Sequence, residues 1–200
     1  MLKPLDLYLL RHGRSEAEEF GVMEYNADFL LTREGQEQAR ELARQLLIRE
    51  QIFEALYTSP LLRASQAAII LAEELGLEML TDERLAEKNI GQIAGMHKEN
   101  IDQRYPKPIE GFLPHHKMGG GTGESRLAFG FRVHECLWAL RERHAGETIL
   151  LVTHGGVINE ALRYLLQTPQ HVIFASGDTV LHHLTWGEQI IVQTLNQRLF

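Results

Sequence analysis

Two short apolar segments, each followed at once by a histidine and a glycine, constrain the fold of this chain most. The first is Leu5–Leu10, which runs into Arg11-His12-Gly13, and the second is Thr148–Val152, which runs into Thr153-His154-Gly155-Gly156. A short and almost continuous apolar run is typical of a strand that is buried on both faces of a parallel sheet. The sequence therefore predicts two buried strands that each end in a histidine.

Apolar residues at helical spacing indicate four helices. Thr32 is expected to cap the first, and Ser59 with Pro60 to begin the second. Gly76 is expected to end the second helix and Gly146 the third. The expected apolar faces are Ala39, Leu42, Ala43 and Leu46; Leu61, Ala64, Ala68, Leu71, Ala72 and Leu75; Phe129, Val133, Cys136, Leu137 and Leu140; and Val157, Ile158, Ala161, Leu162 and Leu165.

Strands that alternate with helices predict an α/β fold. We expect a three-layer sandwich, with a mostly parallel central sheet and helices on both faces. A further strand is predicted at Ala55–Thr58. A terminal hairpin is predicted from Thr179–Trp186 and Ile190–Thr194, which Gly187-Glu188 separates.

Residues 88–123 break this pattern, since they hold three of the six prolines and a run of glycines. We expect a loop-rich cap here, with a short helix near Lys98–Arg104. The chain as a whole, residues 1–200, is then expected to form a single domain with 88–123 as an insertion.

Composition excludes several classes of protein. The formal net charge of −7 argues against nucleic-acid binding, although a locally basic pocket for a small phosphorylated substrate stays compatible with it. The single cysteine, Cys136, excludes an intrachain disulfide and is expected to be inert in the core. No apolar run is long enough to span a membrane and Met1–Pro4 does not begin a signal peptide, so we expect a cytoplasmic protein. The terminal hairpin leaves a homo-oligomer open.

The two strand-ending histidines are candidates for chemistry. Ligands of open α/β sheets bind at the carboxyl ends of parallel strands, so His12 and His154 are expected side by side if their strands are neighbours. Arg63 follows a third strand and lies in the first turn of the expected helix, near the same edge. With Arg11, this set of two histidines and two arginines suits a phosphoryl dianion. The neighbouring positive charge would keep an imidazole neutral and nucleophilic.

Several motifs resemble those of the histidine phosphatase superfamily, which includes the cofactor-dependent phosphoglycerate mutases. Arg11-His12-Gly13-Arg14-Ser15 resembles the Arg-His-Gly-x-Ser/Thr signature of that family. Its other motifs are similar to Leu31-Thr32-Arg33-Glu34-Gly35 with Gln38-Ala39, Tyr57-Thr58-Ser59-Pro60-Leu61-Leu62-Arg63-Ala64, Leu85-Ala86-Glu87 with Gly91, Gly123-Glu124-Ser125, and His154-Gly155. These motifs occur in the family's order and cover nearly the whole chain.

The resemblance implies a role for each matched residue. His12 would attack phosphorus and carry the phosphoryl group, and Glu87 would act as the general acid and base. Arg11, Arg63 and His154 would hold the phosphoryl oxygens, and Ser15 and Gly155 complete the implied substrate-binding set. No metal and no other cofactor is required, because arginine and histidine supply the positive field.

The chain departs from the family's pattern at one position of the phosphate loop. Glu18 stands where the family usually has an asparagine that helps to bind phosphate. A carboxylate beside a phosphoryl group is unfavourable unless it is protonated or turned away. Arg14 and Lys88 also differ from common family residues, and they leave the substrate open.

The leading hypothesis is thus a metal-independent phosphomonoester hydrolase. A phosphoglycerate mutase stays open, because the two reactions differ only in the acceptor, and so does a non-catalytic sensor of a phosphorylated ligand. The pairs His115-His116 and His182-His183 lack partners at ligand spacing, so a metal site is not predicted. His115, His116 and Lys117 are expected to form a basic lip over the pocket instead.

Overall fold

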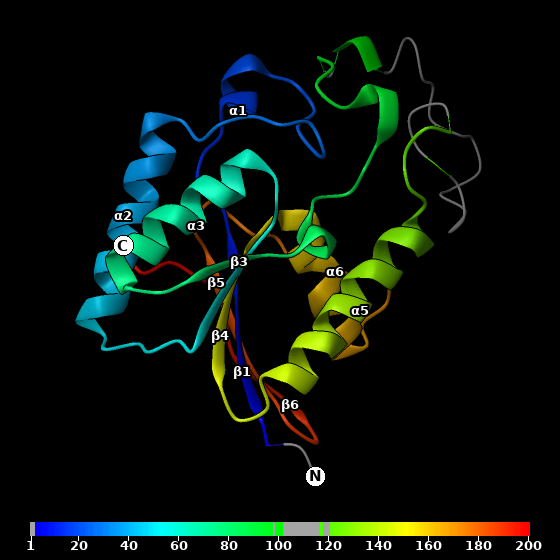
Figure 1. Ribbon diagram of the computed structural model, residues 1–200. Coiled ribbons are helices and arrows are strands. Elements are labelled where there is room, and N and C mark those ends of the chain that lie inside the picture. Colours follow the sequence, from blue (N-terminus) through cyan, green and yellow to red (C-terminus); the bar gives the residue numbers. More distant parts are fainter. Residues whose placement is uncertain (1–2, 98, 102–116, 118–120) are drawn as a thin grey trace.

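The computed structural model describes residues 3–97, 99–101, 117 and 121–200. Its centre is a six-stranded sheet with the strand order β3-β2-β4-β1-β5-β6 (Figure 1). The strands are β1 (Leu5–Arg11), β2 (Ala55–Thr58), β3 (Met79–Thr81), β4 (Thr148–Thr153), β5 (Leu181–Trp186) and β6 (Ile190–Gln197). The first four strands in the order are parallel to one another, whereas β5 and β6 are antiparallel to their neighbours.

Helices cover both faces of the sheet (Figure 1). The α-helices are α1 (Glu16–Phe20), α2 (Arg33–Ile48), α3 (Leu62–Leu75), α5 (Arg126–Arg143) and α6 (Gly155–Leu166), and two short 3-10 helices are η1 (Glu83–Leu85) and η2 (Gly91–Ile93). The buried faces of α2 and α3 form one apolar core with the sheet, and those of α5 and α6 form the other. The predicted α/β sandwich with helices on both faces is confirmed.

Strand β1 contributes buried leucines to both apolar cores. Leu5, Leu7 and Leu9 point into the core under α5 and α6, while Leu10 points into the core under α2 and α3. This strand is paired with β4 on one side and with β5 on the other, so both of its edges are covered. Its four leucines are almost fully buried, whereas the side chain of Asp6 near the start of the strand is 40% exposed. An almost continuous apolar run suits a strand that is largely removed from water on both faces.

Several expected helix boundaries are confirmed. Thr32 caps α2, since its side chain accepts a hydrogen bond of 3.0 Å from the amide of Gly35. Gly76 ends α3 in the left-handed conformation, with φ of 67°. The third helix ends earlier than expected, because α5 stops at Arg143 and Gly146 lies in the turn before β4.

Ser59 does not cap α3, contrary to expectation. The helix begins at Leu62 and Leu61 is its N-cap, so Pro60 lies outside the helix. Strand β3 was not anticipated, because three half-exposed residues carry no periodicity to detect. The terminal hairpin is confirmed as β5 and β6, although its strands cover 181–186 and 190–197 rather than 179–186 and 190–194.

The expected cap at 88–123 is described only in part. The short helix predicted near 98–104 falls mostly outside the described residues, and His115 and His116 of the predicted lip fall outside them entirely. The two described ends of the segment meet: the amide of Asn89 donates to Glu124 Oε1 and the amide of Glu124 donates to the carbonyl of Asn89, both at 2.8 Å. Across the described ranges, no helix is both long enough and apolar enough for a bilayer crossing.

Candidate active site

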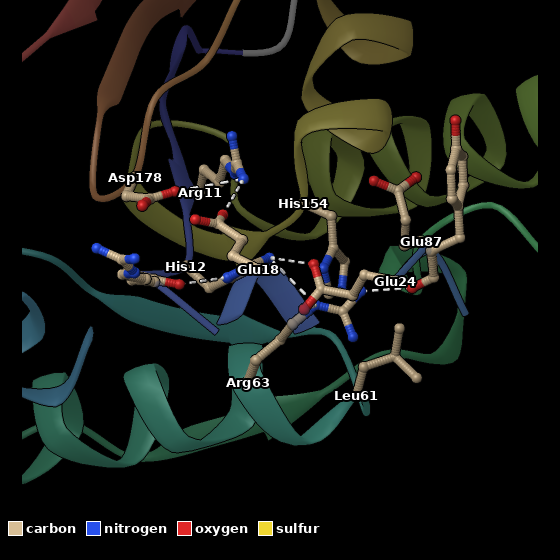
Figure 2. A network of polar contacts seen from close by, with 12 residues as sticks. Arg11, His12, Glu18, Glu24, Leu61, Arg63, Glu87, His154 and Asp178 are labelled. Atoms are coloured by element: carbon tan, nitrogen blue, oxygen red, sulfur yellow. Dashed lines mark hydrogen bonds and ion pairs between the residues drawn. The ribbon is translucent and has the colours of Figure 1, made fainter. Parts of the chain in front are cut away.

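A cavity of about 320 Å³ opens at the carboxyl ends of β1 and β4. Arg11, His12, Arg63, Glu87 and Gly155 line it, and all five were predicted as site residues. Two carboxylates from the segment after β1, Glu18 and Glu24, line it as well. Figure 2 shows these side chains converging from separate elements.

The parallel register of β1 and β4 brings the two histidines together. Arg11 pairs with Thr153, so the next residue of each strand, His12 and His154, leaves the sheet at the same level. The amide of His12 donates to the carbonyl of Thr153 at 3.1 Å, and the ring centroids of His12 and His154 are 5.1 Å apart. The predicted convergence of two histidines at the sheet edge therefore follows from strand pairing.

Hydrogen bonds select one tautomer of His12. Its Nδ1 lies 2.7 Å from the carbonyl oxygen of Gly13, and because a carbonyl only accepts, Nδ1 carries the proton. Nε2 then keeps its lone pair and accepts a hydrogen bond of 3.2 Å from Arg63 Nε. The ring is almost fully buried, and Nε2 is its unprotonated nitrogen.

Both histidines are held neutral. Burial lowers the pKa of His12 well below its ordinary value, and the charges of Arg63 and Arg11 lower it further. Burial is likewise the main cause that lowers the pKa of His154. Neighbouring positive charge was the expected cause, but removal from water is the larger one.

Ser59 orients His154. Its Oγ accepts a hydrogen bond of 3.2 Å from the amide of Leu61 and lies 2.7 Å from His154 Nε2. In the tautomer in which the hydroxyl donates to Nε2, the proton of His154 is on Nδ1, a buried atom without a hydrogen-bond partner in the described part of the chain. Such a donor is available to an oxyanion.

Arg63 is fully buried and fixed by three hydrogen bonds. Besides His12, it donates to the carbonyl oxygen of Ala27 at 2.9 Å and to that of Tyr25 at 2.5 Å. Its Nε also lies 3.1 Å from Glu24 Oε1. The guanidinium is therefore held in place from two sides before any ligand binds.

Arg11 is held from the loop before β5. Its NH1 donates to the carbonyl oxygen of Ser176 at 2.6 Å, and its NH2 lies 3.3 Å from Asp178 Oδ1 and 3.4 Å from Glu18 Oε1. Ser176 is in turn bonded to His182 Nε2 at 2.9 Å. Arg11 therefore has two carboxylate partners, Glu18 and Asp178. The sequence analysis had singled out Glu18 but not Asp178.

Glu87 is nearly buried and faces the start of α6. Its Oε2 accepts from the amide of Gly156 at 2.8 Å and its Oε1 accepts from the amide of Lys88 at 2.7 Å. A Cβ at Gly156 would lie 2.2 Å from Glu87 Oε1, so only glycine allows this approach. One of the first free amides of α6, that of Gly156, therefore binds the carboxyl group of Glu87.

Arg132 fixes the backbone that carries Glu87. Its NH1 donates to the carbonyl oxygens of Arg84 and Ala86 at 2.8 and 2.7 Å, and its NH2 donates to that of Glu87 at 3.2 Å. The same guanidinium forms a two-pronged pair with Glu124 at 3.1 and 2.7 Å. The position of Glu87 therefore depends on a residue of α5 that no motif singled out.

The remaining predicted site residues, His154 and Ser15, lie behind the side chains that line the cavity. His154 packs edge-on against His12, and Ser15 is fully buried at the start of α1, close to Glu24. Within the described ranges, no three histidine, cysteine or acidic side chains are grouped to hold a metal ion.

Comparison with known proteins places the chain in a family. Residues 7–195 match the model of the histidine phosphatase superfamily (branch 1), so the chain belongs to this superfamily of enzymes. This confirms the resemblance that its motifs indicated.

Some of the similar proteins are named phosphatases and others are named mutases or mutase-like proteins. The chain is 33% identical over 149 residues to phosphoserine phosphatase 1 of Hydrogenobacter thermophilus, covering 74% of this chain and 70% of that one. It is 32% identical over 157 residues to phosphoglycerate mutase-like protein 4 of Arabidopsis thaliana, covering 76% and 67%. Among solved structures, YhfR of Bacillus stearothermophilus superposes with a TM-score of 0.86 at 27% identity, covering 97% and 98%.

His182 yields a prediction about stability. Burial lowers its pKa to about 4, compared with about 6.5 in an unfolded chain. The unfolded state then takes up a proton first as the pH falls, so stability is full above about pH 6.5 and is lost toward pH 4. We expect this histidine to account for about 3 kcal/mol of that loss. Denaturant unfolding of wild type and His182→Gln at pH 7 and pH 4 measures it.

The control for that measurement is His171→Gln, which removes an exposed histidine. If His182→Gln lost as much stability between pH 7 and pH 4 as the wild type, the assignment to His182 would be wrong.

Proposed function

We propose that this protein is a metal-independent phosphomonoester hydrolase that works through a phosphohistidine on His12. The observation that carries the proposal is the state of His12: a neutral, buried ring that lines the cavity together with Arg11 and Arg63. Its unprotonated Nε2 accepts a hydrogen bond from Arg63, which the attack on phosphorus must displace. A cavity of about 320 Å³ suits a small phosphorylated substrate.

In the first step, His12 Nε2 attacks phosphorus and the bond between phosphorus and the ester oxygen breaks. Glu87, as a protonated carboxyl, gives its proton to the departing oxygen. Arg11, Arg63 and the Nδ1 proton of His154 bind the phosphoryl oxygens and stabilise the charge of the transition state. In the second step, Glu87 takes a proton from water, which attacks the phosphohistidine and releases inorganic phosphate.

The charge of the cavity favours a phosphatase over a phosphoglycerate mutase. A mutase must bind phosphoglycerates, which carry a carboxylate in addition to the phosphate. Here Glu18, Glu24 and Glu87 already line the cavity, and a further carboxylate would be repelled.

Three measurements test the proposal together. Wild-type protein should hydrolyse p-nitrophenyl phosphate at an unchanged rate in EDTA, and a rapid alkaline quench should trap a phosphoryl group on His12. Incubation with 3-phosphoglycerate and 2,3-bisphosphoglycerate should show no rapid interconversion of phosphoglycerates. Fast interconversion without release would establish a mutase, and phosphate binding with no turnover would establish a sensor.

Arg132→Met is expected to lower kcat at least about tenfold while leaving KM nearly unchanged, because it frees the backbone of Glu87 without touching the cavity. The reduction should be larger for an alkyl phosphate than for p-nitrophenyl phosphate, whose leaving group needs little protonation. Steady-state kinetics with both esters measures it.

The matched control is Arg44→Met, which removes a surface arginine of α2. A rise in KM with kcat unchanged would contradict a positioning role for Arg132, and so would equal slowing of both esters.

A further inference from the structure

Glu24 lies where a phosphoryl group has to bind. Its Oε2 is 4.0 Å from His12 Nε2, the attacking atom, and its Oε1 is 3.1 Å from Arg63 Nε. The side chain lines the cavity and is only 18% exposed. Figure 2 shows Glu24 reaching toward Arg63, whereas Glu18 reaches toward Arg11 nearer the rim.

The backbone around Glu24 is fixed from both sides. The amide of Met23 donates to the carbonyl of Met96 at 2.8 Å, and the carbonyl of Met23 accepts from the amide of Gly95 at 2.7 Å. On the other side, Arg63 binds the carbonyls of Tyr25 and Ala27. Glu18 is 41% exposed and has room to turn into solvent, but Glu24 is held against the nucleophile.

The groups that face Glu24 do not supply enough positive charge for a second anion. They are Arg63 from α3, Arg11 and the neutral His12 at the end of β1, and Ser15 and Glu18 at α1. Arg11 is already shared between Glu18 and Asp178. A fully ionised phosphate ester would therefore meet a carboxylate at contact distance with only one guanidinium between them.

A proton between the two anions removes this conflict. The carboxyl group can donate it to a phosphoryl oxygen, or a protonated phosphoryl group can donate it to the carboxylate. Burial raises the pKa of Glu24, against the opposing effect of Arg63, so the carboxyl is suited to hold a proton.

We propose that Glu24 is a specificity-determining residue that shares one proton with the bound phosphoryl group, so that the site accepts oxyanions that carry or readily take up a proton and rejects those that stay unprotonated. This inference rests on the proposed function, because it assigns the phosphoryl group to the same cavity. A phosphate monoester loses its second proton near pH 6. Above that pH the ester is a dianion, and binding takes up one proton from solvent.

Inorganic phosphate and sulfate test the inference directly. Both are tetrahedral, but at pH 7 sulfate carries no proton, whereas inorganic phosphate is a mixture of its monoanion and dianion and always keeps a proton that it can share. Calorimetric titration at pH 7 should show wild type binding phosphate at least about tenfold more tightly than sulfate. Glu24→Gln keeps the shape of the side chain and removes its charge, so it should bind sulfate about as tightly as phosphate.

The control variant is Glu19→Gln, which removes one carboxylate from the exposed face of α1 and lies outside the cavity lining. It should keep the wild-type preference for phosphate. A second readout is kcat/KM for p-nitrophenyl phosphate, which should fall about tenfold per pH unit above pH 6 in wild type and less steeply in Glu24→Gln.

The outcomes separate this inference from the proposed function. Equal binding of phosphate and sulfate by a wild type that turns over p-nitrophenyl phosphate overturns the role of Glu24 alone. Continued rejection of sulfate by Glu24→Gln does the same. A wild type that neither binds phosphate nor turns over an ester overturns both proposals.

Discussion

Replacement of His12 by alanine is expected to lower kcat for phosphate monoesters by at least about 10⁴-fold and to abolish the covalent phosphoenzyme. Among the described residues, no other histidine and no serine, threonine or cysteine lines the cavity, and His12 Nε2 is the atom that Arg63 orients. His154 is not expected to substitute, because its Nε2 is bonded to Ser59. Initial rates and alkaline-quench labelling measure both effects.

His171→Ala is the control, since it removes an exposed histidine, and thermal unfolding of both variants checks that the fold persists. Activity within about a hundredfold of wild type in His12→Ala, with a labelled residue elsewhere, would show that the nucleophile is a different group.

Glu87→Gln is expected to slow the hydrolysis of alkyl phosphates by about 10²- to 10⁴-fold and that of p-nitrophenyl phosphate less than about tenfold. Glutamine keeps the hydrogen bond from the amide of Gly156 but has no proton to give to a poor leaving group. A nitrophenolate departs without one, so the ratio of the two rates isolates the acid. Single-turnover measurements of phosphoenzyme formation with both esters give this ratio.

Glu83→Gln serves as the matched control, because Glu83 is an exposed carboxylate of η1 in the same segment. If both esters slowed equally in Glu87→Gln, this carboxyl would not be the acid, and Glu24 would be the next carboxyl to test, since it lies closest to His12.

The parts of the fold and site that follow from local pattern were predictable. An apolar run that is covered on both faces needs no knowledge of its partners to be recognised, which is why β1 and β4 were found. Parallel pairing then fixes His12 beside His154 almost automatically. Arg63 was placed by its position in the first turn of α3, which the helical periodicity gives.

The parts that depend on contacts distant in sequence were not predictable. Glu24 and Asp178 are single carboxylates in loops without periodicity, and only the folded chain brings them to Arg63 and Arg11. Ser59 looked like a helix cap because its sequence neighbours fit one, but its hydroxyl is bonded to a histidine 95 residues away. The cavity therefore holds Glu24 in addition to Glu18 and Glu87, which the sequence analysis had singled out.

Three expectations stay predictions: the single-domain organisation, the cytoplasmic location and the formation of a homo-oligomer. The basic lip formed by His115, His116 and Lys117 also stays a prediction, since its two histidines fall outside the described residues.

The central place of β1 has a consequence for how the molecule is made on the ribosome. In the sheet, Leu7 lies opposite Ile149 of β4 and Leu184 of β5. Both of these residues are synthesised long after Leu7. Until those strands emerge, β1 exposes both apolar faces and two open edges, which makes it prone to association with chaperones or other nascent chains. Folding must also await contacts of high sequence separation, which slows it. A nascent chain arrested before β4 would already contain His12, Arg63 and Glu87 but would lack His154, so its site would be incomplete.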